Sequence, residues 1–121
     1  MTMSQEIKNI AEAIQQAVPV EKIYLFGSHA YGTPRRDSDY DFYIIIPEGS
    51  MRPIEAMQKA QMALCAFGSS IPAVDVKAST QRKFDIMRNR VSAVEKEVAR
   101  RGVILYERHG MAAQMARTRP E

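Results

Sequence analysis

Hydrophobic positions along the chain change their spacing several times, and each spacing predicts a different element. Near the start they recur at helical spacing from Ser4, a candidate N-cap, to about Ala17, and Pro19 ends the pattern. We therefore expect a helix here, with one apolar stripe that covers a sheet. The residues of the stripe are Ile7, Ile10, Ala11, Ile14 and Val18.

Short apolar runs bounded by glycine or proline predict the strands of that sheet. Residues 22–27 (KIYLFG) and 40–47 (YDFYIIIP) form two such runs, and residues 102–107 (GVILYE) form another. Residues 71–78 (IPAVDVKA) predict a further strand with two different faces. Val74 and Val76 lie on one face of it, and Asp75 and Lys77 lie on the other.

Two longer stretches predict helices. Between Pro53 and Phe67 the apolar residues have helical spacing, and Pro53 suits the first turn. Residues 80–101 are polar with scattered apolar positions and predict one or two helices. Cys65 falls on the apolar face of the first stretch, so we expect it in the core. The other apolar positions of that stretch are Ile54, Met57, Ala60, Met62 and Leu64.

Alternating helices and strands predict an α+β fold, an α/β sandwich in which helices pack against a small mixed β-sheet. The 121 residues suffice for a single core, and 45% hydrophobic with 26% charged residues is typical of folded soluble proteins. We expect one domain over residues 1–107. Residues 108–121 lack a clear apolar period, so a loosely ordered C-terminal tail is expected there.

Charge and cysteine content argue against several functional classes. The formal net charge of +3 lacks the basic stripe of a charge-driven nucleic-acid binder, although it is compatible with holding one polyphosphate. The single cysteine permits no intrachain disulfide and no cysteine-cluster zinc site, as expected of a cytoplasmic protein. No apolar segment approaches the roughly 20 residues that span a bilayer, so we expect neither secretion nor membrane insertion.

Gly27 and Ser28 interrupt the apolar pattern where a strand is predicted to end. Such a junction exposes backbone N–H groups, and glycine lets a phosphate approach them closely. An ordinary structural turn is the alternative for this pair taken alone.

Asp39 and Asp41 flank one tyrosine at the start of the next strand. Their carboxylates should project from one face, with Cα atoms about 7 Å apart. Two such groups repel one another unless a cation lies between them, and Mg²⁺ or Mn²⁺ suits carboxylate oxygens, water and phosphates. The alternative is a solvated loop with hydrogen-bonding aspartates. The strongly apolar strand that follows favours the metal site, because acidic residues are poorly tolerated there without a purpose.

Asp75 would complete this site if its strand lies beside that of Asp41. Three carboxylates would then converge, and two of them can hold a pair of metal ions about 3.5–4 Å apart while the third accepts a proton. The alternative is an edge-strand aspartate paired with Lys77 or an arginine.

Four basic residues lie near these carboxylates in the sequence. Lys77 suits either a salt bridge or a phosphate contact. Arg35 and Arg36 precede the aspartate pair and would either touch a triphosphate or lie in a solvated loop. We expect His29 on the surface.

The spacing of these residues is specific to one superfamily. Gly27-Ser28, ten intervening residues and then Asp39-Tyr40-Asp41 make up the segment LFGSHAYGTPRRDSDYDFYIII. This segment resembles the minimal branch of the DNA polymerase beta-like nucleotidyltransferase superfamily, and the resemblance runs over roughly residues 5–107. It implies a nucleotidyltransferase fold.

The resemblance also implies the roles of these residues. Gly27 and Ser28 would hold the β- and γ-phosphates of a nucleoside triphosphate, ATP, while Asp39 and Asp41 would bind two Mg²⁺ ions, or Mn²⁺ in their place. Asp75 would complete the metal site and help to activate the acceptor hydroxyl. Attack on the α-phosphate would transfer AMP and expel pyrophosphate, a reaction that depends on positioning and charge neutralisation.

Three hypotheses for the acceptor stay open. Because little concave surface is expected beyond the metal site, the acceptor or its walls should come from another chain. Short proteins of this kind resemble the antitoxins of HEPN–MNT toxin–antitoxin pairs, which implies transfer of AMP to a tyrosine of the HEPN toxin. The alternatives are a non-catalytic antitoxin that acts by contact, and a stand-alone enzyme for small molecules such as antibiotics, which a homodimer would favour.

Overall fold

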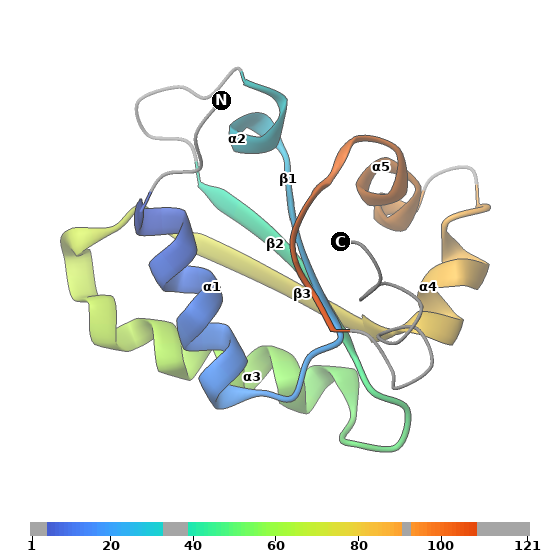
Figure 1. The fold of residues 1–121 in the computed structure, drawn as a ribbon, viewed down its shortest axis with the longest axis horizontal. Coiled ribbons are helices and arrows are strands. Elements are labelled where there is room, and N and C mark those ends of the chain that lie inside the picture. Colours follow the sequence, from blue (N-terminus) through green and yellow to red (C-terminus); the bar gives the residue numbers. More distant parts are fainter. Residues whose placement is uncertain (1–4, 33–38, 91–92, 109–121) are drawn as a thin grey trace, which may run out of the picture.

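The computed structural model describes residues 5–32, 39–90 and 93–108. Its elements follow the order expected from the sequence (Figure 1). They are α1 (Gln5–Ala17), β1 (Lys22–Phe26), α2 (Ser28–Tyr31), β2 (Tyr40–Ile46), α3 (Pro53–Leu64), the 3₁₀ helix η1 (Cys65–Ser70), β3 (Val74–Thr80), α4 (Gln81–Met87), α5 (Val94–Arg101) and β4 (Val103–Glu107).

The four strands form one mixed sheet in the order β3-β2-β1-β4. β1 pairs antiparallel with β2 on one side and with β4 on the other, whereas β2 and β3 are parallel. A parallel pair needs a long crossover connection, which α3 and η1 supply between β2 and β3. The predicted α+β fold with a small mixed sheet is confirmed.

Helices cover the sheet on both faces (Figure 1). α1 and α3 pack against one face through a large apolar cluster that contains the whole predicted stripe of α1. Phe84 of α4 and Val98 of α5 pack against Tyr24 and Tyr43 on the other face. Side chains alternate between the two faces along each strand, so successive residues of β2 from Phe42 to Ile46 belong to the two clusters in turn.

The prediction for the face of α3 was wrong in part. Ala56, Ala60 and Leu64 are the buried residues of this helix, whereas Ile54 and Met62 are 48% and 75% exposed. The α-helix ends at Leu64, and Cys65 begins η1 as an exposed residue rather than a core one. Small alanines face the core because α1 and α3 contact one another there.

The expectations of a loose C-terminal tail and of no membrane-spanning segment can be compared with the described residues only. Apart from Arg108, the predicted tail lies outside the described residues. Within the described ranges, no helix combines the length and the apolar character that crossing a bilayer requires.

Candidate active site

The turn after β1 brings the backbone against an acidic side chain. Gly27 has φ 78° and ψ −165°, a conformation that side-chain-bearing residues rarely adopt, and α2 begins at the next residue. A Cβ atom at Gly27 would lie 2.4 Å from Oδ2 of Asp41. Glycine is therefore required here both for its backbone conformation and for the close approach of the Asp41 carboxylate.

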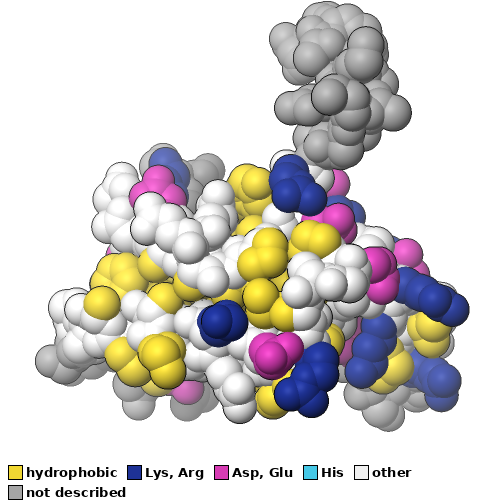
Figure 2. All heavy atoms as spheres, turned by 90° about the horizontal axis from the view of Figure 1, so that it is seen from below, with side chains coloured by type: hydrophobic (Ala, Val, Ile, Leu, Met, Phe, Trp, Pro, Cys, Tyr) yellow, Lys and Arg dark blue, Asp and Glu magenta, His cyan; other side chains and the backbone are white. Residues whose placement is uncertain are grey.

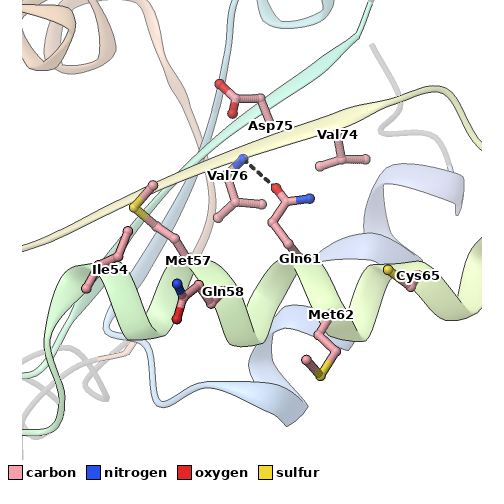
Figure 3. A pocket seen from close by; sticks show the side chains of 9 residues that line it. All are labelled: Ile54, Met57, Gln58, Gln61, Met62, Cys65, Val74, Asp75 and Val76. Carbon is pink, nitrogen blue, oxygen red and sulfur yellow. Dashed lines mark hydrogen bonds between the residues drawn. The ribbon is translucent and has the colours of Figure 1, made fainter.

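Asp41 occupies a central position in the sheet. In the strand register it faces Phe26 of β1 on one side and Asp75 of β3 on the other. Residues directly opposite one another in a parallel pair project from the same face of the sheet. Figure 3 shows the Asp75 carboxylate pointing away from α3, while Val74 and Val76 lie on the α3 side. The structure thus puts the two carboxylates on the face opposite α3.

The surroundings of Asp41 disfavour the charged form of its carboxyl group. Partial burial raises the pKa of the Asp41 carboxyl above its ordinary value of 3.8, and the negative charges of Asp75 and Asp39 raise it further. Lys77 and His29 act in the opposite direction. The charged form of Asp41 is therefore disfavoured in the folded protein, as expected of a partly buried carboxylate with two acidic neighbours.

The three carboxylates differ in how they are held. Asp75 accepts a hydrogen bond and ion pair from Lys77 Nζ at 2.7 Å, and both side chains are partly exposed. Asp39 lies just before β2 and is exposed. Within the ranges that the structure describes, no three His, Cys, Asp or Glu side chains are grouped as a metal site. The expected convergence is thus present as the facing pair Asp41 and Asp75, with Asp39 close enough to Asp41 to affect its charge.

His29 is a residue of this site that sequence reasoning placed simply on the surface. Its side chain is half-buried, and its ring lies 4.3 Å from the ring of Tyr40, centroid to centroid. The Tyr40 hydroxyl in turn donates a hydrogen bond to the Glu6 carboxylate of α1. The position of His29 directly after Ser28 in the sequence was the signal that could have identified it as a residue of the site.

The structure brings together most of the predicted site residues. Gly27, Asp41 and Asp75 lie side by side across three neighbouring elements, and Lys77 pairs with Asp75. Ser28 is half-buried at the start of α2. Arg35 and Arg36 lie outside the described residues. The roles of all these residues as phosphate or metal ligands stay predictions.

Comparisons with known proteins agree with this arrangement. The family model of the nucleotidyltransferase domain matches residues 7–104. No curated protein matches the chain. A solved toxin–antitoxin structure with AMP-PNP is 21% identical, with TM-score 0.60, and the alignment covers 90% of this chain and 77% of that one.

Two further solved structures have a similar fold. A mutant of the toxin–antitoxin MntA-HpeT with two Asp-to-Glu exchanges is 19% identical, with TM-score 0.59, over 90% of this chain and 77% of that one. A second MntA-HpeT mutant is 21% identical, with TM-score 0.59, over 94% of this chain and 80% of that one. These likenesses show that the chain has the same fold as those proteins.

Proposed function

The chain belongs to the nucleotidyltransferase domain family, and from this premise we propose that it is a metal-dependent protein adenylyltransferase. It transfers AMP from ATP to a tyrosine hydroxyl of a HEPN-type toxin, and the modification silences the toxin. The observation that carries the proposal is the pairing of Asp41 with Asp75 across neighbouring parallel strands, directly against the side-chain-free backbone of Gly27.

The donor set of this site suits a divalent cation. Carboxylate oxygens are the ligands that Mg²⁺ prefers. The pKa of Asp41 is raised first by burial and then by the negative charges of Asp75 and Asp39, and a bound cation would relieve this charge repulsion. Asp39, Asp41 and Asp75 would hold the metal, which when bound neutralises the phosphate oxygens. Gly27 leaves its backbone open to the β- and γ-phosphates beside Ser28.

The chain's own residues have definite tasks in this reaction. Asp75 accepts the proton of the acceptor hydroxyl, while Asp39 and Asp41 act as metal ligands. The hydroxyl oxygen forms a bond to the α-phosphorus of ATP, and the bond from that phosphorus to the bridging oxygen breaks, so that pyrophosphate leaves. Lys77 exchanges its pairing with Asp75 for a phosphate oxygen, and Arg35 and Arg36 of the neighbouring segment bind phosphate oxygens as well.

Support for the partner and the nucleotide comes from the solved structures. All three are complexes or mutants of toxin–antitoxin pairs, and one contains AMP-PNP, a non-hydrolysable analogue of ATP. This favours a toxin as acceptor over a small molecule. Assignment of the toxin to the HEPN class rests on the family resemblance of the segment that contains Gly27-Ser28 and Asp39-Tyr40-Asp41.

Transfer of a radioactive label tests the proposal directly. The protein is incubated with Mg²⁺, ATP labelled at the α-phosphate and the purified HEPN-type protein encoded beside it. We expect label on the partner, none when ATP is labelled at the γ-phosphate, and none with the Asp41→Asn variant. If the protein binds ATP with Mg²⁺ and the partner nevertheless stays unlabelled, the proposal is contradicted.

A second candidate function is neutralisation of the toxin by contact alone, and two features of the carboxylates favour it. Asp75 is already paired with Lys77, and the described residues do not assemble a three-ligand metal site. An Asp39→Ala/Asp41→Ala variant that still neutralises the toxin would establish this second function. Loss of neutralisation in a folded variant would exclude it.

A further inference from the structure

A groove of about 760 Å³ runs along the edge of the sheet, between α3 and β3. We call it the α3–β3 groove. Residues 74–76 of β3 form one wall, and six residues of α3 and η1 form the other. These six are Ile54, Met57, Gln58, Gln61, Met62 and Cys65 (Figure 3).

The groove gives α3 a second apolar face. Its lining residues follow the spacing i, i+3 or i+4, i+7 or i+8 and i+11, which is one stripe of a helix, distinct from the stripe that packs into the core. Ile54 and Met62 on this second stripe are largely exposed. Figure 2 shows the lower face of the molecule in Figure 1, where hydrophobic side chains gather in several groups, with a basic side chain between them. Such a patch marks an interaction surface.

The chemistry of the groove fits an apolar partner. Among the described residues that line it, Asp75 alone is charged, and its carboxylate is paired with Lys77 and points away from α3 (Figure 3). Gln61 Oε1 accepts a hydrogen bond from the Val76 N–H at 3.1 Å, so this donor on the edge strand β3 is already used. Addition of a strand is therefore disfavoured there, and the insertion of apolar side chains is favoured.

The length of the groove suits a helix. From Ile54 to Cys65 the stripe spans eleven residues, which corresponds to about 16 Å or three helical turns. An amphipathic helix fills such a groove with apolar anchors spaced three or four residues apart. Met57 and Met62 supply flexible side chains that adapt to the shape of the anchors.

The position of Asp75 connects the groove to the candidate active site. Its backbone lines the groove at the sheet edge, while its side chain faces the same way as Asp41 in the neighbouring strand. We propose that the α3–β3 groove binds an amphipathic helix of the acceptor protein, and that this contact delivers the acceptor hydroxyl over the edge of β3 to Asp41 and Asp75. The inference rests on the proposed function and names the surface by which its substrate is recognised.

Charge substitution at the exposed positions tests the proposal. Ile54→Glu/Met62→Glu places two carboxylates in the groove without touching the core, and Ile86→Glu on α4, whose side chain is 52% exposed, is the matched control. We expect affinity for the purified HEPN-type partner to fall about tenfold or more in the groove variant only, as for central interface residues. Binding of Mg²⁺ with AMP-PNP stays unchanged in both variants.

Each outcome of this experiment has one meaning. Equal partner affinity in the groove and control variants, while the wild type binds nucleotide and modifies the partner, overturns the inference and leaves the proposed function intact. A wild-type protein that neither binds nucleotide nor modifies the partner refutes the proposed function instead, and the inference with it. A wild type that self-associates through the groove, shown by sedimentation and abolished by the groove variant, also overturns it.

Cys65 provides an independent readout. It is the single cysteine of the chain, is exposed and lines the groove, so a maleimide carrying a photoreactive benzophenone attaches there alone. Irradiation with the partner should give a cross-linked product whose partner peptide is helical and apolar on one side. No product with Cys65→Ser is the control. Cross-linking absent from a complex that forms with normal affinity would contradict the proposed location.

Discussion

The Asp41 carboxylate lies where its charged form is disfavoured, and Gly27 leaves the space that the carboxylate occupies. The glycine has a positive φ, and its missing side chain leaves room for a carboxylate that is disfavoured by burial and by two other acidic residues. Groups held against their solution preference are frequent at functional sites. In the proposed function, Asp41 would bind a cation and Gly27 would leave room for a phosphate, so that neither residue is optimised for stability.

Replacing Gly27 with alanine should damage both folding and binding. Positive φ disfavours alanine by about 1–3 kcal/mol, and the new Cβ would displace the Asp41 carboxylate. Gly49→Ala is a matched control, because Gly49 also has φ 78° but a Cβ added there would meet none of the described atoms within 4 Å. Thermal denaturation should show a loss in both variants. Calorimetric titration with Mg²⁺ and AMP-PNP should show lost binding in Gly27→Ala only, and retained binding there would refute the assigned contact.

Asp41→Asn should stabilise the protein at neutral pH while abolishing metal-dependent binding. Because the pKa of Asp41 is raised in the folded state, its charged form opposes folding above that pKa, and the neutral asparagine removes this effect. The gain should shrink as the pH falls through the raised pKa and vanish below 3.8, where wild-type Asp41 is protonated in both states.

Melting temperatures across this pH range give the measurement. We expect Asp41→Asn to melt a few degrees above wild type at pH near 7, with Asp85→Asn on α4 as the control. Added Mg²⁺ should raise the melting temperature of the wild type alone. A variant that melts lower than wild type at neutral pH would show that Asp41 is a stabilising residue.

At the scale of elements, Tyr43 connects β2, β3 and α5 on the face of the sheet that also carries Asp41. Its hydroxyl is buried and donates to Glu95 Oε2 of α5 at 2.6 Å, and it lies 2.9 Å from Ser79 Oγ of β3. Burial and the Glu95 carboxylate both raise the pKa of Tyr43, so the hydroxyl stays protonated and able to donate. This contact fixes α5 and β3 to the strand that carries Asp41.

Tyr43→Phe should therefore destabilise the fold without affecting the chemistry. Removing the hydroxyl takes a hydrogen-bond partner from the buried Ser79 and the half-buried Glu95, at a cost of about 1–3 kcal/mol in the free energy of unfolding. Urea denaturation measures this loss, and Tyr106→Phe on β4 controls for the general effect of removing a tyrosine hydroxyl. Nucleotide affinity should stay within about twofold of wild type, because the Tyr43 hydroxyl contacts Ser79 and Glu95 rather than a site carboxylate. A large loss of affinity with unchanged stability would contradict this assignment.

The elements themselves could largely be predicted from the sequence, but α3 shows where such reasoning fails. Periodicity identified the helix, yet its apolar residues occupy two faces, and the single apolar face expected from the sequence combined residues of both. The core face instead contains Ala56 and Ala60, because two helices that pack closely need small residues at the contact. Ile54 and Met62 were thereby left for the groove.

The candidate site followed from the sequence to the extent that spacing encodes it. The GS and DxD segments lie around β1, α2 and β2 as predicted, and alternation placed Asp75 on the charged face of its strand. Alternation alone left the pairing of Asp41 with Asp75 conditional on their strands being neighbours, and the crossover through α3 meets that condition by making β2 and β3 parallel. Likewise, no short-range signal shows that His29 contacts Tyr40.

In the molecule as a whole, the candidate site and the α3–β3 groove lie on opposite faces of the sheet and meet at its edge strand β3. The α4 and α5 helices cover part of the face on which Asp41 and Asp75 project, and α1 and α3 cover the other face. The edge strand β3 contributes both a carboxylate to the site and a wall to the groove. A partner bound at this edge would therefore supply the surface that a small catalytic domain needs for its second substrate.

Calorimetric titration of AMP-PNP asks whether the carboxylates of this sheet form a metal-dependent nucleotide site, on which the proposed adenylyl transfer depends. The titration is made with and without Mg²⁺, on the wild type and on Asp39→Ala/Asp41→Ala. We expect binding to the wild type that requires Mg²⁺ and is lost in the variant, while the variant keeps its cooperative thermal unfolding. Equal binding by both proteins, or none by the wild type even in the presence of its partner, would show that the site does not bind nucleotide in this way.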